Sequence, residues 1–331
     1  MRRKSINILL GIAVFLLLTN IAVEIFTEDV DEKIPNDISV ALIDSSFHRV
    51  LVEYSIDAEH IQKKIVRARL SDSLDYVYDV KLPADIPSPN ILRDVKNELN
   101  FPAIRLESVE EKTFGNTRLN IYSNDMLKLT AKLSYDKNFL RPYSELSFII
   151  ESGWEMSDDD FKTLIKIPFP FGVELIPSIE NEGRLDAIRE YNKEYVVLIN
   201  DDIDDSRFKL SSKLSQGLLR GSVGEIVNAF RGAVYFIVDE KSELYRSAIF
   251  NFIRDEFKKR NVRVIPKSQF VMMQTTDPDE MASLFNFYCE SGKSKKGKTI
   301  LISWQGFNSL DNEIEIAKKK GHKFLLPSLL K

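Results

Sequence analysis

The sequence contains little cysteine: its 331 residues include a single one, Cys289. Because Cys289 cannot form an internal disulfide, the folded parts of the chain must be stabilised by their cores alone. Cys289 lies in the amphipathic stretch MASLFNFYCE, and no histidine is close to it in the sequence. We therefore expect it to fill a buried helical face and not to act as a nucleophile.

Histidine is almost as scarce. The three residues His48, His60 and His322 lack metal-ligand spacing, and none of them follows a predicted strand. A catalytic zinc site needs three protein ligands, usually including histidine. The acidic run DDIDD (residues 201–205) lacks the glycine and the distal glutamate of a calcium loop, so we interpret it as a solvated loop. The sequence thus predicts neither a metal site nor a bound cofactor.

An excess of basic charge is also missing. Lys and Arg number 46 against 50 Asp and Glu, a formal net charge of −4. Without a broad basic field, nucleic acid is not an expected partner. The segment GKSKKGKT (residues 292–299) matches the pattern of a phosphate-binding loop, but a helical pattern precedes it and a strand pattern follows, the reverse of the required order. We interpret it as a solvated basic turn and predict no nucleotide binding.

Charge is entirely absent between Lys4 and Glu24, where the chain reads SINILLGIAVFLLLTNIAV. This stretch is long enough to span a bilayer, and basic residues before it with acidic residues after it favour a cytoplasmic N-terminus. We predict that residues 1–27 form a cytoplasmic stub and a retained signal anchor in the inner membrane. The single-pass chain then has its following domains in the periplasm or outside the cell. A cleaved signal peptide is the alternative, although Asn20-Ile21-Ala22 matches a cleavage site poorly.

Two folded domains are expected beyond an acidic linker at residues 28–37. Residues 38–140 predict a small α+β domain. Apolar residues recur at helical spacing over 38–56 and after a cap at Ser88 or Asn90. Four stretches alternate as strands, and they are DYVYDVKLP, AIRLESV, TRLNIYS and MLKLTAKLSY. An antiparallel sheet with helices on one face is the expected product.

The pattern changes in residues 145–331, where short, continuously apolar runs alternate with helical segments. The helical segments include SDDDFKTLIKI, with a cap at Ser157, and the long segment SELYRSAIFNFIRDEFKKR, which begins at residue 242. The runs are ELSFII, FGVELIP, YVVLI, AVYFIV, VRVIP, KTILISW and KFLLP. Strands that do not alternate are covered on both faces, which is typical of a parallel sheet or barrel. Ligands of such folds bind at the carboxyl ends of the strands. Function is therefore expected at those ends.

The segments SFIIESGW, IPFPFGVELIPS, GAVYFIVDEKS and TILISWQG, in this order, resemble the divergent polysaccharide deacetylases, exported relatives of the carbohydrate esterases. The resemblance spans about residues 145–331 and implies a distorted (β/α) barrel, here preceded by the small α+β domain and the transmembrane helix. In that family the first strand ends in Asp-Asp-x-Gly. A strand after Gly-Ala-Val ends in histidine, and another late strand ends in His-Pro.

This chain departs from the family at each of those places. Glu151 and Ser152 stand where the paired aspartates are expected, Asp239 stands at the end of the strand after Gly-Ala-Val, and Trp304 replaces the late histidine. A serine hydroxyl is a weak metal ligand, and the indole nitrogen only donates. Without a metal, no bound water has its pKa lowered to about 7. The resemblance therefore implies a pseudoenzyme with no catalytic residues and no metal.

What remains is a groove of aromatic and carboxylate side chains suited to stacking on sugars and accepting their hydroxyl hydrogen bonds. Packing in the core is the alternative interpretation of both tryptophans. The candidate groove residues are Glu151, Ser152, Trp154, Asp239, Glu240 and Trp304.

Three hypotheses follow. The leading one is a membrane-anchored, catalytically inactive envelope protein that binds glycan, peptidoglycan or a partner protein at the cell wall. In the second, Glu151 and Asp239 act as an acid and base pair on a glycosidic bond, which requires carboxyls about 5 to 9.5 Å apart. In the third, the 38–140 domain is an adaptor that docks an envelope complex.

Overall fold

The computed structural model describes residues 37–65, 76–111, 115–201, 203–291 and 297–330. They form two compact units: the first ends at Phe139, and the second runs from Leu140 and includes Glu53–Ser55. The predicted membrane span lies outside the described residues. Within the described ranges, no helix is both long and apolar enough to cross a bilayer.

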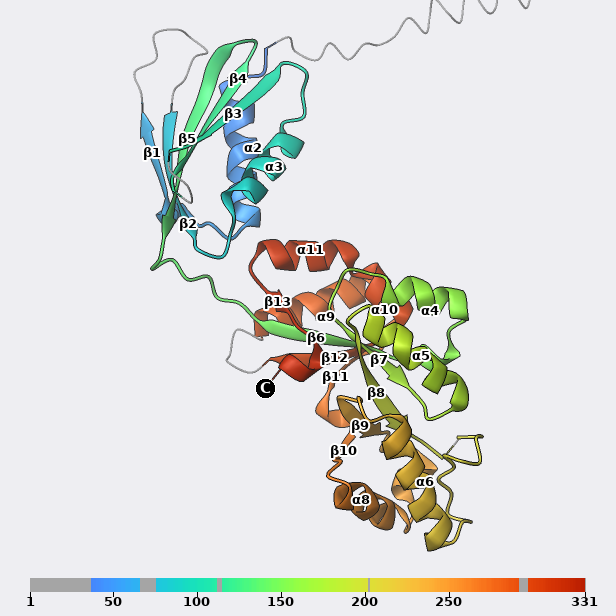
Figure 1. Ribbon diagram of the computed structural model, residues 1–331. Coiled ribbons are helices and arrows are strands. Elements are labelled where there is room, and N and C mark those ends of the chain that lie inside the picture. The colour runs from blue at the N-terminus through green and yellow to red at the C-terminus, as the bar shows by residue number, and fades with distance from the viewer. Residues whose placement is uncertain (1–36, 66–75, 112–114, 202, 292–296, 331) are drawn as a thin grey trace, which may run out of the picture. The chain divides into compact units, whose positions relative to one another are not determined.

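The first unit is a five-stranded sheet with the order β1-β2-β5-β4-β3. Strand β4 alternates between buried and less buried side chains, so one face is covered, and Figure 1 shows both helices on that face. The elements are α2 (Val40–Glu53), β1 (Ile61–Ile65), β2 (Tyr76–Pro83), α3 (Ser88–Glu98), β3 (Ile104–Glu110), β4 (Thr117–Ser123) and β5 (Met126–Asp136).

This sheet is not wholly antiparallel, which corrects the expectation from the sequence. β5 pairs with β2 in parallel, with Val80 opposite Leu133, while the other three pairings are antiparallel. The parallel pairing arises because α3, β3 and β4 intervene, and β5 then enters beside β2. β1 is an additional strand whose polar sequence, IQKKI, did not predict it.

The second unit is built on an all-parallel sheet of eight strands. Seven of them follow the order β10-β9-β8-β7-β6-β12-β11, and the eighth, β13, pairs with β6. The sheet curls into an open half-barrel (Figure 1). The strands are β6 (Glu145–Ile150), β7 (Gly172–Leu175), β8 (Glu194–Ile199), β9 (Tyr235–Val238), β10 (Val264–Pro266), β11 (Val271–Met273), β12 (Lys298–Ile302) and β13 (Lys323–Phe324).

The α-helices described for the second unit pack on the outer face of this curled sheet. Alternate strand residues such as Phe148, Val197 and Ile300 belong to a large core shared with the helices, whereas Ile149, Val196 and Leu301 form a smaller cluster on the inner face. The helices are α4 (Asp158–Ile165), α5 (Ile179–Glu190), α6 (Gln216–Ala229), α7 (Glu243–Arg246), α8 (Phe250–Lys259), α9 (Pro278–Ser291), α10 (Trp304–Ser309) and α11 (Asp311–Lys319).

Several local predictions are confirmed. Ser157 caps α4 by accepting a hydrogen bond from the Asp160 amide, and Cys289 is buried in α9. Burial raises the pKa of the Cys289 thiol to about 12, as expected for an inert filler. Helix α9 ends at Ser291 and strand β12 begins at Lys298, which is the order of helix and strand expected around the basic segment, whose residues 292–296 lie outside the described residues.

Two boundaries differ from expectation. The predicted strand KTILISW ends at Ile302, because Ser303 caps α10 by accepting a hydrogen bond from the Gly306 amide, so Trp304 is the first residue of a helix. The predicted long helix from residue 242 is broken into α7 and α8, since Ser247 has an extended backbone. β11 is a short strand that the sequence did not reveal.

A C-terminal segment packs against the amino ends of β8 and β9. The Ser328 amide donates to Glu194 at 2.9 Å, and the Tyr235 hydroxyl donates to the Pro327 carbonyl at 3.1 Å. Gly172 leaves room for this segment, because a Cβ at that position would lie 3.0 Å from Pro327. The carboxyl ends of the strands form the opposite, open end, where Glu151 and Ser303 line a cavity.

Candidate functional site

At the open end, β6 delivers the sequence Glu151-Ser152-Gly153. Phe148 and Ile150 face the outer core, so alternation points Ile149 and Glu151 to the inner side. The Glu151 amide donates to the Ile302 carbonyl at 2.9 Å, which continues the pairing with β12. Glu151 is therefore held at the mouth of the half-barrel by the sheet itself.

The turn after Glu151 is tight. Ser152 has a left-handed backbone, with φ of 54°. A Cβ at Gly153 would lie 2.2 Å from Val173 Cγ1 and 2.8 Å from the Glu174 carbonyl oxygen, so only glycine allows this approach to β7. The approach brings the Ser152 amide within 3.2 Å of Glu174 Oε2, to which it donates.

The centre of the mouth holds an ion cluster that we call the Lys267 triad, formed by Glu151, Glu174 and Lys267. Lys267 Nζ lies 2.6 Å from Glu174 Oε1 and 3.3 Å from Glu151 Oε1. The Glu174 side chain is wholly buried, and those of Lys267 and Glu151 are 11% and 14% exposed. One ammonium group thus pairs with two carboxylates, and all three side chains are largely shielded from water.

The charge state of the triad follows from its surroundings. Burial alone lowers the pKa of Lys267, but the attraction of Glu174 and Glu151 outweighs burial and raises it above the usual value. Burial raises the pKa of Glu174, against the opposing effect of Lys267. Lys267 is consequently a firmly charged ammonium and not a nucleophilic amine.

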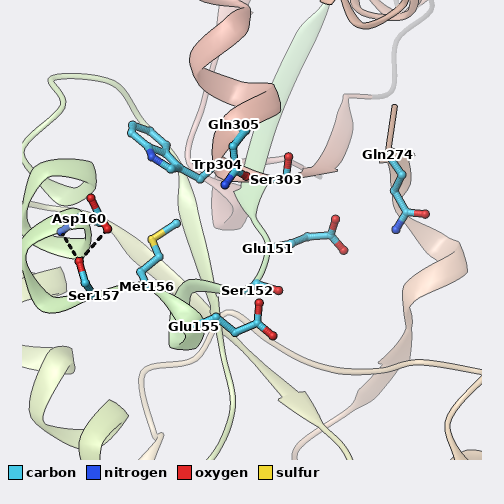
Figure 2. A pocket seen from close by; sticks show the side chains of 10 residues that line it. All are labelled: Glu151, Ser152, Glu155, Met156, Ser157, Asp160, Gln274, Ser303, Trp304 and Gln305. Atoms are coloured by element: carbon cyan, nitrogen blue, oxygen red, sulfur yellow. Dashed lines mark hydrogen bonds between the residues drawn. The ribbon is translucent and has the colours of Figure 1, made fainter. Parts of the chain in front are cut away.

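A cavity of about 740 Å³ opens beside the triad. In Figure 2, Glu151 points across it toward Gln274, while Trp304 lies with Met156 on the side of α4. The residues that line this mouth cavity are Glu151, Ser152, Glu155, Met156, Ser157, Asp160, Gln274, Ser303, Trp304 and Gln305. They combine carboxylates, hydroxyls and amides with one indole, a set that can bind hydroxyl-rich ligands.

Arg184 on α5 fixes the loop that forms one wall of the mouth cavity. Its guanidinium donates to the carbonyls of Gly153 at 2.8 Å and Met156 at 2.9 Å, and it pairs with Asp158 at 2.9 Å. The same group lies over the Phe161 ring at 4.7 Å. The wall is therefore held by hydrogen bonds to its backbone.

The structure brings together three of the six predicted groove residues. Glu151, Ser152 and Trp304 line the mouth cavity. Trp304 also packs against the outer core, so both interpretations of this side chain apply. Trp154 packs against the inner cluster and does not line the cavity.

The remaining two groove residues, Asp239 and Glu240, have hydrogen-bond partners that do not line the mouth cavity. Asp239 accepts a hydrogen bond from the Lys241 amide at 2.8 Å, and Glu240 accepts one from the Ser268 hydroxyl. Neither lines the mouth cavity. Asp239 and Glu151 are thus not presented to one ligand in this cavity.

The mouth does not fit the divalent metal of the deacetylases. The place between its two inward carboxylates is taken by the Lys267 ammonium, 2.6 Å and 3.3 Å from their oxygens. No group of three or more histidine, cysteine, aspartate or glutamate side chains within the described part of the chain is arranged to hold a metal ion. A metal entering here would have to displace a paired internal cation.

Comparisons with known proteins give structural neighbours only. No protein-family model and no curated protein matches the sequence. Among solved structures, BA3943, a CE4 family pseudoenzyme from Bacillus anthracis, is 14% identical over 69% of this chain and 89% of its own, with a TM-score of 0.38. Bacillus subtilis PdaA, a family 4 carbohydrate esterase, is 12% identical over 56% and 79%, with a TM-score of 0.33.

An uncharacterized protein from Agrobacterium tumefaciens, ATU2773, is similar at 9% identity over 58% of this chain and 91% of its own, with a TM-score of 0.38. The solved structures similar to this chain therefore include CE4 family polysaccharide deacetylase-like proteins, pseudoenzymes among them.

Sequence reasoning missed the Lys267 triad, although two signals were present. Glu174 interrupts the apolar run FGVELIP, and a charged residue in a buried strand requires a partner. Lys267 directly follows the strand VRVIP, at a carboxyl end. The two residues are 93 positions apart, and only the curled sheet brings them together.

Proposed function

We propose that the second unit is a catalytically inactive, deacetylase-like domain of a membrane-anchored envelope protein, and that it binds glycan in the mouth cavity. The proposal rests on one observation: the Lys267 ammonium lies between Glu174 and Glu151, where a metal-dependent hydrolase needs an open cation site. An ammonium group cannot activate a bound water as a metal does. Binding is the function left to the mouth cavity.

The first experiment tests catalysis. The full-length protein, purified in detergent, is assayed for bound metal and for acetate release from acetylated chitooligosaccharide. We expect less than one zinc per ten chains and no acetate above the buffer rate. Stoichiometric zinc together with acetate release would contradict the proposal.

The second experiment tests glycan binding. Trp304 and Gln305 both line the mouth cavity, so Trp304→Ala and Gln305→Ala should each weaken binding of chitooligosaccharide or peptidoglycan fragments, the first by roughly tenfold or about 1.4 kcal/mol. Gln305→Ala keeps the test meaningful if loss of Trp304 disturbs the core. Phe287→Ala, at an aromatic side chain that is 61% exposed elsewhere, is the matched control. Equal binding by all variants would remove the mouth cavity from the proposal.

One observation favours the adaptor hypothesis as a second candidate. Strand β3 is an outer strand of the first sheet, and five of its seven side chains are exposed. An edge of this kind can pair with a strand of another protein. A chain in which only residues 1–140 are expressed should then restore the cellular function of a deletion strain. Failure of that chain, with restoration by the full-length protein, assigns the function to the second unit.

A further inference from the structure

The second unit has another hollow, at the end of the sheet where the strands begin and apart from the mouth cavity. A hollow of about 730 Å³ lies between the end of α8 and the start of β10, and we call it the basic hollow. It is lined by Arg254, Asp255, Lys258, Asn261, Val262, Arg263 and Val264. Because Arg263 precedes β10 whereas Glu151 follows β6, the basic hollow and the mouth cavity belong to opposite ends of the parallel sheet (Figure 1).

The local sequence explains why cations gather here. Arg254, Lys258 and Asn261 are spaced i, i+4 and i+7, so they share one face of α8 and its final turn. Arg263 joins them from the connection to β10, after Asn261 reverses the chain with a φ of 60°. Three cations and a single carboxylate, Asp255, therefore surround the hollow.

The basic side chains on α8 and just after it fall into two groups, those that pair with Glu256 and those that do not. Glu256, on the buried side of the helix, pairs with Lys259 at 2.6 Å and with Arg260 at 3.0 Å. The other three basic side chains, Arg254, Lys258 and Arg263, are exposed. None of them forms an ion pair with a carboxylate in the described part of the chain. These three cations are available to a ligand.

We propose that the basic hollow binds a linear polymer that carries phosphate groups. Guanidinium groups bind phosphate oxygens in pairs, and lysine adds a point charge, so two arginines and one lysine suit successive phosphates. The hollow has a volume of about 730 Å³ and its three cations are exposed, so a polymer can reach them from solvent. None of its lining residues is among the large hydrophobic side chains exposed on the described surface, so it offers no apolar group to enter a lipid bilayer.

This proposal is independent of the mouth cavity, and its test uses inorganic polyphosphate as the probe. The full-length protein in detergent should bind polyphosphate with an affinity that falls steeply with salt. The triple variant Arg254→Ala/Lys258→Ala/Arg263→Ala should lose about tenfold or more in affinity. The slope of log affinity against log salt should fall by about 2.

The matched control is Lys162→Ala/Lys166→Ala/Lys213→Ala. It removes the same charge from exposed positions of the same unit, outside the hollow. We expect the control to retain affinity within about twofold, and all proteins to share one thermal unfolding midpoint. Equal losses in both triple variants would overturn the proposal, since the effect would then come from net charge alone.

Two further measurements sharpen the result. Arg254→Lys keeps the charge but not the paired donors, and it should weaken binding by less than Arg254→Ala. Micelles containing phosphatidylglycerol, added at the same phosphate concentration, should displace little polyphosphate. Full displacement by these micelles would overturn the choice of a polymer over a lipid surface.

Discussion

In the described part of the second unit, two buried glutamates, Glu174 and Glu256, lie beside cations, and their surroundings are built in opposite ways. At the mouth, one ammonium group, Lys267, serves both Glu174 and Glu151. On α8, Glu256 alone is served by Lys259, Arg260 and Arg220. We call the second group the Glu256 cluster.

The surroundings of the two carboxylates set their pKa values in opposite directions. Burial raises the pKa of Glu174. Hydrogen bonds from Lys259 and Arg260 lower the pKa of Glu256 to about 2. Breaking a buried ion pair with few partners costs a large part of the unfolding free energy. Breaking a pair with a surface cation costs less, because that cation can be hydrated instead. The mouth is therefore the place where one substitution should matter most.

The largest loss of stability is expected when Lys267, the only cation of the triad, is replaced. Lys267→Met leaves two carboxylates facing each other without a counter-charge, and breaking such a pair typically costs about 3–5 kcal/mol of unfolding free energy. Urea unfolding at neutral pH measures this loss.

The additional change Glu174→Gln should restore a large part of the stability, because it removes the unpaired buried charge. Lys166→Met, at an exposed position, is the control and should change little. A loss below about 1 kcal/mol in Lys267→Met would show that the triad contributes no more than a surface pair.

The second effect concerns the turn that positions the triad. Gly153→Ala places a methyl group 2.2 Å from Val173 Cγ1, and the resulting overpacking should cost about 1–3 kcal/mol. Gly221, within α6, is a matched control because a Cβ there meets nothing within 4 Å. Gly221→Ala should instead stabilise the helix by roughly 0.5–1 kcal/mol. Thermal unfolding of both variants tests the contrast, and equal behaviour would refute the tight turn.

The smallest change in stability is expected when the Glu256 cluster is altered, and this change depends on pH. The folded pKa of Glu256, about 2, lies below its ordinary value of 4.5. Its contribution to stability is therefore present above about pH 4.5 and is lost as the pH falls toward 2. Glu256→Gln should be less stable than the original chain at pH 7 and indistinguishable from it near pH 2. A difference that does not change with pH would exclude the ionised carboxylate as the cause.

The local features were accessible from the sequence, and the long-range ones were not. The cap at Ser157, the burial of Cys289 and the apolar strands β6 and β8 follow from neighbouring residues and were predicted. The parallel pairing of β2 with β5 depends on which strand edge remains free, and no local pattern encodes that choice.

The candidate site was predicted in part for the same reason. Glu151, Ser152 and Trp304 lie within two residues of the ends of β6 and β12, so their place at the mouth could be expected. Asp239 also follows a strand, but its carboxylate turns to the Lys241 amide two residues on, a local hydrogen bond that competes with the cavity. Lys267 and Glu174 meet only across the curved sheet.

The segment seated against Glu194 and Tyr235 has a consequence for how a long saccharide can be held. Pro327 and Ser328 are bonded beside the first residues of β9 and β8, so the chain itself occupies this part of the amino end. Under the proposed function, a polysaccharide would therefore reach the mouth cavity from the carboxyl side of the sheet. It would lie across the rim with a few internal sugars in contact, or insert one terminus.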